Sequence, residues 1–245
     1  MFRHDLTSNI RTFVQRNLGR PLHMLFTEPI VGLLCVYMSF QFGLLYCFVL
    51  ASPWVYQRAY GFGLEAQSLS FLGLAIGCCT GSFILILVEK RVYQPRLLLY
   101  KSEGTLEKFP PEERLYAAMF GSICLPSGLF IFAWTARPDI HWIVPMLAQG
   151  LAMIGSLTIY VPSGMYMMET YGALYGASAS GANSLLRYLL AASFPLFTLQ
   201  MFQHLGTGWA SSLLGFITVA MAPIPWCFRR WGRGLRSGSR YVVDD

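Results

Sequence analysis

One arginine, Arg187, stands alone among apolar residues, and its side chain is the clearest candidate for binding chemistry in this sequence. It separates two uncharged stretches, 170–186 and 188–228. Placing a guanidinium midway across a bilayer costs at least about 2.5–3.5 kcal/mol, so it needs protein partners or a water-filled cavity. Asn183 lies one helical turn earlier, where its amide oxygen could accept a hydrogen bond from Arg187. Two interpretations stay open: a structural arginine tied to neighbouring carbonyl groups, or an arginine that lines a translocation cavity.

Residues that catalysis or a metal would need are scattered along the chain. The four histidines are far apart, the acidic residues lie outside the apolar runs or at their edges, and the six cysteines fall in or beside those runs. Nucleophilic catalysis needs a nucleophile next to a base, and zinc needs closely spaced ligands. We therefore expect no enzyme, no metal site and no cofactor.

Two further sets of residues are candidates for a cavity wall and for close helix packing. Tyr37 and Gln41 share one helical face with apolar neighbours, which fits either a substrate-facing stripe or ordinary core packing. Small residues recur at four-residue spacing in two other runs, which lets helix backbones approach closely in lipid. The glycines concerned are Gly73, Gly77 and Gly81 in one run and Gly181 in another.

The elements that must position these residues are membrane-spanning helices. Of the 245 residues, 55% are hydrophobic and 12% are charged, whereas soluble domains carry about 25% charged residues. A bilayer core about 30 Å thick needs about 20 apolar helical residues per crossing. We expect an all-α polytopic membrane protein with six spans. They cover about 30–51, 68–88, 115–135, 140–162, 173–201 and 209–228, with a turn near His204, Gly206 and Gly208.

Basic residues predict the orientation of these spans. Fifteen of them fall in segments that six spans place on one side, against two, Arg58 and Arg137, on the other. We therefore expect both termini in the cytoplasm: 1–29 as a cytoplasmic segment, 30–228 as the bundle and 229–245 as a basic tail. The formal charge of +6 then describes flanks beside anionic lipid rather than a nucleic-acid surface. The fifteen are Arg3, Arg11, Arg16, Arg20, Lys90, Arg91, Arg96, Lys101, Lys108, Arg114, Arg229, Arg230, Arg233, Arg236 and Arg240.

The acidic residues at the edges of the spans have a simpler expected role. Glu112 and Glu113, together with Arg114, indicate the solvated start of a helix. Glu169 is expected to cap a helix at the membrane interface.

Several stretches together resemble fungal major facilitator transporters, in particular the drug:proton antiporter branch. They follow the same order from about residue 20 to residue 240. These stretches are Glu28-Pro29-Ile30-Val31, Pro111-Glu112-Glu113-Arg114-Leu115, Gly128-Leu129-Phe130 with Phe132-Ala133-Trp134-Thr135, His141-Trp142-Ile143-Val144-Pro145, Ala177-Ser178-Ala179 with Asn183 and Arg187, Phe194-Pro195-Leu196-Phe197, Trp209 to Phe216, and Pro223-Ile224-Pro225.

The resemblance implies a fold and an activity. Such transporters have twelve spans in two halves, with the substrate bound between the halves near the midplane. This chain resembles the second half only, so residues 1–29 would end the central loop. The implied activity is proton-coupled export of small organic compounds of the drug or toxin class, mostly apolar or cationic. Arg187, Asn183, Tyr37 and Gln41 would line the cavity, and the expected location is the plasma membrane.

The expected partners follow from the same resemblance. They are the lipid bilayer, a small-molecule substrate with a proton, and a missing N-terminal half or a second chain. A six-span half cannot alternate access alone, because the second wall of the cavity is missing. The alternative is a transport-inactive membrane remnant or truncated gene model with at most an assembly role.

Overall fold

The computed structural model describes residues 19–105, 109–239 and 241, and within these ranges the regular structure is helical, with no strands. Five helical stretches in these ranges are long and apolar enough to cross a membrane. They are Pro29–Tyr60, Leu64–Ser102, Pro111–Thr135, Ile143–Gly172 and Tyr175–Ser237. The helices are α2 (Arg20–Thr27), α3 (Pro29–Tyr60), α4 (Leu64–Ser68), α5 (Ser70–Val88), η2 (Glu89–Tyr93), α6 (Gln94–Ser102), η4 (Pro111–Leu115), α7 (Tyr116–Thr135), α8 (Ile143–Met221) and α9 (Pro223–Ser237).

Helix α3 shows how local sequence sets the ends of a span. It begins at Pro29, whose missing N–H costs nothing in the first turn. It ends at Tyr60, and the next residue, Gly61, caps it with a left-handed φ of 67°. Its 32 residues rise about 48 Å at 1.5 Å per residue, well beyond a bilayer core of about 30 Å. The predicted span 30–51 is therefore the apolar part of a longer helix.

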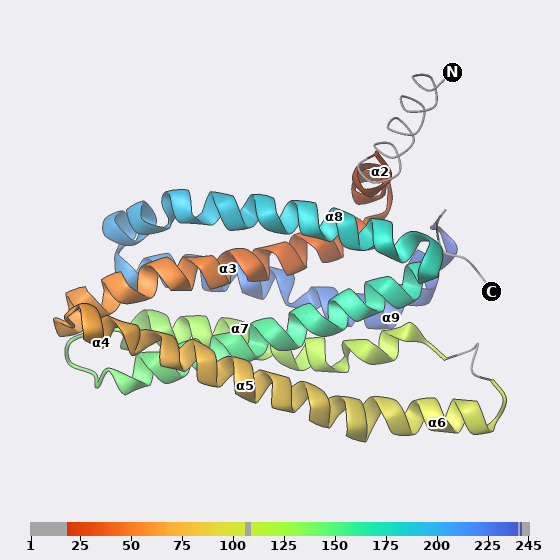
Figure 1. The fold of residues 1–245 in the computed structure, drawn as a ribbon, viewed down its shortest axis with the longest axis horizontal. Coiled ribbons are helices and arrows are strands. Elements are labelled where there is room, and N and C mark those ends of the chain that lie inside the picture. Colours follow the sequence, from red (N-terminus) through yellow and green to blue (C-terminus); the bar gives the residue numbers. More distant parts are fainter. Residues whose placement is uncertain (1–18, 106–108, 240, 242–245) are drawn as a thin grey trace, which may run out of the picture.

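Two glycines divide α8 into three segments, which we call first (143–171), second (173–205) and third (207–221). Gly172 has φ 59° and ψ −169°, and Gly206 has φ 74° and ψ 165°, so neither backbone is helical. Figure 1 shows the ribbon labelled α8 reversing its direction twice. The apolar stretch Tyr175–Ser237 is 63 residues long and contains Gly206. The structure thus gives five candidate stretches where the sequence predicted six spans, and a glycine interrupts the fifth.

The helices run roughly alongside one another, and their connections gather at two ends (Figure 1). One end carries α2, α6, η4, the end of α9 and the first reversal of α8; we call it the basic end. The opposite end carries α4, the loop between α7 and α8, and the second reversal. Of the predicted basic flanks, Arg3, Arg11, Arg16, Lys108 and Arg240 lie outside the described residues. The other ten lie on α2, η2, α6, η4 and α9.

The core forms two buried clusters with α8 at the centre of both. The larger contains Tyr37, Phe48, Phe132 and Phe202, and the second lies nearer the basic end around Met24, Tyr166 and Phe228. Aromatic rings pack edge to face in the first cluster, with Phe48 and Phe132 centroids 5.5 Å apart. This packing fixes α3 and α7 against α8, which positions the polar residues described next.

Candidate functional site

Arg187 lies on the second segment of α8, inside a small group of aromatic rings. Its Nη1 donates a hydrogen bond to the Tyr160 hydroxyl at 2.5 Å, and its Nη2 donates to the Tyr188 hydroxyl at 3.1 Å. The guanidinium carbon lies 4.9 Å from the Phe42 ring centroid and 4.8 Å from that of Tyr188. Arg187 is half-buried, while Tyr188 is 60% exposed, so the site opens to the surface on one side.

The charge of Arg187 is satisfied by hydroxyl groups and ring faces rather than by a carboxylate. Within the described residues it forms no ion pair, and its Nε is buried without a hydrogen-bond partner. Ring faces attract a cation through their quadrupole, most strongly where water is excluded. This arrangement stabilises the guanidinium while leaving its positive charge available to a further group.

The other predicted cavity residues are buried in this structure. Asn183 is buried, and its Oδ1 has no hydrogen-bond partner, so the predicted bond from Arg187 is wrong. Tyr37 and Gln41 are each 1% exposed, and neither amide atom of Gln41 has a partner. The residue of α3 that reaches Arg187 is Phe42, next to Gln41 in the sequence. Phe42 therefore lies on a neighbouring face of α3.

The predicted packing glycines of α5 face the first segment of α8. A Cβ added to Gly77 would lie 2.5 Å from the backbone oxygen of Gly150, and one added to Gly73 would clash with the backbone oxygen of Met146. Gly81 is less tight, with its nearest atom at 3.3 Å. Gly181 instead faces a proline ring of α2 at 3.4 Å. The α5 backbone thus approaches α8 as closely as the absence of side chains allows.

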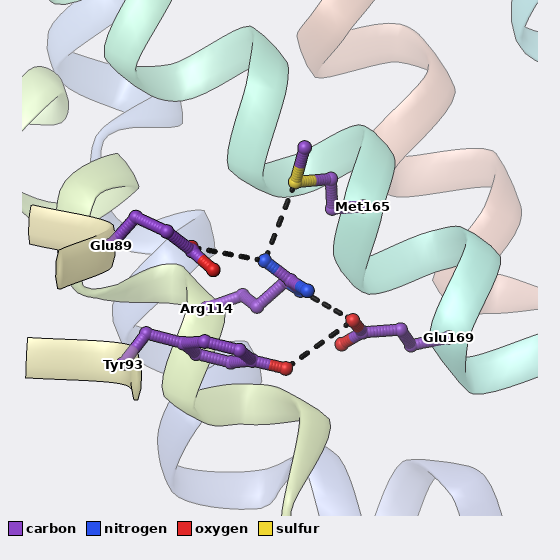
Figure 2. Close-up of polar contacts among 5 residues, drawn as sticks. All are labelled: Glu89, Tyr93, Arg114, Met165 and Glu169. Atoms are coloured by element: carbon purple, nitrogen blue, oxygen red, sulfur yellow. Dashed lines mark hydrogen bonds and ion pairs between the residues drawn. The ribbon is translucent and has the colours of Figure 1, made fainter. Parts of the chain in front are cut away.

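A second polar group lies at the basic end, where Arg114 joins three elements (Figure 2). Its Nη1 donates to Glu89 at 3.2 Å, and its Nε donates to Glu169. The Tyr93 hydroxyl also donates to Glu169, at 3.4 Å, and the Arg114 guanidinium carbon lies 4.0 Å from the Tyr93 ring centroid. The group therefore links η2, η4 and the first segment of α8, beside a cavity of about 390 Å³.

Two more ion pairs brace the same end of the bundle. Arg236 of α9 pairs with Glu112 at 2.9 Å, and Arg96 of α6 pairs with Glu113. Glu112 is 5% exposed, so the predicted solvated helix start is wrong at this position. These ion pairs were not predicted from the sequence, because each joins residues that are distant along the chain and no spacing rule connects them.

No three His, Cys, Asp or Glu side chains gather into a possible metal site among the described residues.

Comparison with curated proteins finds relatives along nearly the whole chain. It is 35% identical to polyamine transporter 4 of Saccharomyces cerevisiae, over 95% of this chain and 38% of that protein. It is also 35% identical to the major facilitator superfamily multidrug transporter FLU1 of Candida albicans, over 97% of this chain and 38% of that protein. Efflux pump atB of Aspergillus terreus is 38% identical, over 96% of this chain and 49% of that protein. The chain belongs to the major facilitator superfamily. The family inferred from the sequence resemblance is thereby confirmed.

This major facilitator chain is a multi-pass membrane protein, as its long apolar helices and its transporter relatives both indicate. It spans between 38% and 49% of the length of the relatives just named. No protein-family model and no solved structure matches it.

Proposed function

We propose that this chain is the C-terminal half of a proton-coupled exporter of small organic compounds of the drug or toxin class. In this account six helices cross the membrane, both termini are cytoplasmic, and a second six-helix half completes the pathway, on the same polypeptide or another. The relatives include proteins named as a multidrug transporter and as efflux pumps. The chain itself would bind and move substrate rather than react with it.

Backbone geometry supports six crossings rather than five. The stretch Tyr175–Ser237 has 63 residues, about 94 Å as one helix, three times the thickness of a bilayer core. The non-helical backbone at Gly206 divides it into two pieces that each suffice for one crossing. With six crossings, both ends of the bundle's chain lie on the same side, and the positive-inside rule assigns the basic end to the cytoplasm.

Arg187 is the observation that carries the assignment of a binding surface. Counting from Gly172 and Gly206, the non-helical ends of its helix, Arg187 lies close to the middle, and therefore near the centre of the bilayer. Ionisable residues at that depth line cavities or pathways far more often than they face lipid. We infer that Arg187, with Tyr160, Phe42 and Tyr188, forms one wall of the substrate cavity. Asn183, Tyr37 and Gln41 lie behind that wall as buried polar groups that a change of conformation could expose.

Transport then requires the two halves to rock against one another around this wall. The close contact of α5 with α8 would move as a rigid unit, because neither backbone has room to shift. The ion pairs of Arg114 would hold the cytoplasmic ends of α5, α7 and α8 together during that motion. The plasma membrane is the proposed location.

The test is efflux from a chimera in which this chain replaces the matching segment of FLU1, expressed in a yeast strain that lacks its own exporters. This chimera is compared with the chain expressed alone and with unaltered FLU1 as the positive control. We expect the chimera to lower the accumulation of a fluorescent drug, and the chain alone to leave it unchanged. Efflux by the chain alone as a monomer would refute the half-transporter proposal. A chimera that reaches the membrane in normal amounts and transports nothing would support the inactive-remnant alternative.

A further inference from the structure

A groove at the basic end combines arginine and tryptophan side chains that the transport pathway does not use. It has a volume of about 470 Å³ and lies between α7 and α9. Its lining is Met119, Pro223, Trp226, Cys227, Arg229, Arg230 and Trp231. Pro225, Phe228 and Gly232 form the buried side of α9, so the same helix presents its cationic and aromatic side chains outward.

Arg229 is held in a fixed position by α7. Its Nη2 donates to the Tyr116 hydroxyl, and its guanidinium carbon lies 3.8 Å from the centroid of the Tyr116 ring. Its Nη1 is 3.7 Å from the sulfur of Met119. None of these partners is charged, so the contacts orient the guanidinium without neutralising it.

The arginines of this groove differ from three arginines at the same end that already have a carboxylate partner. Arg96, Arg114 and Arg236 each pair with a glutamate. Arg229 and Arg230 form no ion pair within the described residues, although both are exposed. Other exposed arginines of this end, such as Arg233, are also unpaired there, but they do not line the groove. The groove therefore holds two adjacent positive charges that no carboxylate of the described residues neutralises.

The tryptophans place the groove at the surface of the bilayer. Trp226 is 48% exposed and Trp231 is 59% exposed, and the Trp226 Nε1 donates to Ser122 of α7 at 3.3 Å. Tryptophan favours the boundary between headgroups and acyl chains, where its ring is apolar and its N–H is wet. A ligand in the groove would thus meet guanidinium groups at headgroup level and apolar surface below.

We propose that this groove binds the phosphate headgroup of an anionic phospholipid. Arg229 and Arg230 contact the phosphate, because guanidinium groups donate paired hydrogen bonds to phosphate oxygens. The rings of Trp226 and Trp231 pack along the glycerol and the upper acyl chains. Clusters of basic residues next to the membrane end of a helix favour anionic lipids for the same electrostatic reason. Binding here is independent of transport, since the groove lies at the basic end and Arg187 lies near mid-helix.

The experiment uses the purified full chain in nanodiscs of phosphatidylcholine, titrated with phosphatidylserine and, separately, with phosphatidylinositol 4-phosphate. Bound lipid is counted by native mass spectrometry after release from the nanodisc. The test variant is Arg229→Gln with Arg230→Gln. The matched control is Arg58→Gln with Arg137→Gln, because these arginines also lie over tryptophans, at 5.4 Å and 5.1 Å, but at the opposite end.

We expect the wild-type chain to retain anionic lipid over phosphatidylcholine. The test variant should bind the anionic lipids about tenfold or more weakly, since each basic residue near a membrane surface contributes measurably. The control variant should bind them as the wild type does. Size-exclusion profiles and melting temperatures of all three proteins are compared, and we expect them to agree because the fold is kept. Equal losses in the test and control variants would overturn the proposal, as would no loss in either. Binding of soluble inositol 1,4-bisphosphate as tightly as the lipid would show a free phosphate site and would also overturn it.

Discussion

Replacing Arg187 by alanine should lower transport more than tenfold while changing the stability of the fold little. The substitution removes the hydrogen bond to Tyr160, about 1.5–3 kcal/mol for a charged donor, and the ring contact with Phe42, up to about 2 kcal/mol. It also removes a charge whose cost within the membrane is about 2.5–3.5 kcal/mol. The bond to Tyr188 adds little, because that side chain is 60% exposed. The lost contacts and the removed cost of the charge nearly cancel, so the free energy of unfolding should change by no more than about 2 kcal/mol.

The assay follows both quantities in the chimera with FLU1. Thermal unfolding in detergent reports stability, immunoblotting reports the amount in the membrane, and drug accumulation reports efflux. We expect efflux to fall more than tenfold, about 1.4 kcal/mol or more of lost substrate interaction, with normal expression. Arg58→Ala is the matched control, since Arg58 is exposed and lies over Trp54, and it should keep full efflux. If Arg187→Ala instead unfolds the protein, the arginine is a structural residue and the reasoning is refuted.

Three further substitutions test the packing and the reversal of the chain. Gly77→Val should destabilise the bundle by about 1–3 kcal/mol, because its Cβ would lie 2.5 Å from a backbone oxygen of α8. Gly63→Val is the control in the same thermal melts, because a Cβ at Gly63 would have no atom within 4 Å. Arg114→Ala should lower the free energy of unfolding by about 1–3 kcal/mol, between the values for surface and buried ion pairs. Denaturant titration compares it with Arg91→Ala. A loss no larger than that of Arg91→Ala would contradict the geometry of Figure 2. Gly206→Ala should cost about 1–3 kcal/mol, because φ 74° with ψ 165° suits only glycine; an unchanged melting temperature would argue against the reversal there.

The sequence predicts the class and the course of this fold because bilayer physics acts on long, local patterns. Uncharged runs locate the apolar stretches, and the glycine-rich segment near residue 206 correctly marks a break in helical backbone. The ends of helices are less predictable. Helix α3 continues to Tyr60 and α9 to Ser237, since helical hydrogen bonding continues past the point where apolar residues stop.

The site is predictable only in part, because its geometry depends on contacts between segments. Arg187 is identified by its isolation in the sequence, yet its partners Tyr160 and Phe42 come from other segments. The predicted partner Asn183 shares its helix but does not bond to it. Glu169 was expected to cap a helix, and the fold places it against Arg114, 55 residues away along the chain, which no local pattern predicts.

The most direct test of a pathway wall at Arg187 is the water accessibility of the adjacent Ser184, measured in a cysteine-free form of the FLU1 chimera. Ser184→Cys is nearly isosteric and lies one turn from Arg187 on the same side of the helix. Ile123→Cys on α7 is the control, because Ile123 is 59% exposed and is expected to face lipid. We predict that a membrane-impermeant maleimide labels the Ser184→Cys variant, that drug substrate slows this labelling, and that the Ile123→Cys variant stays unlabelled. Labelling of the Ser184→Cys variant no faster than that of the control, with or without drug, would contradict the account.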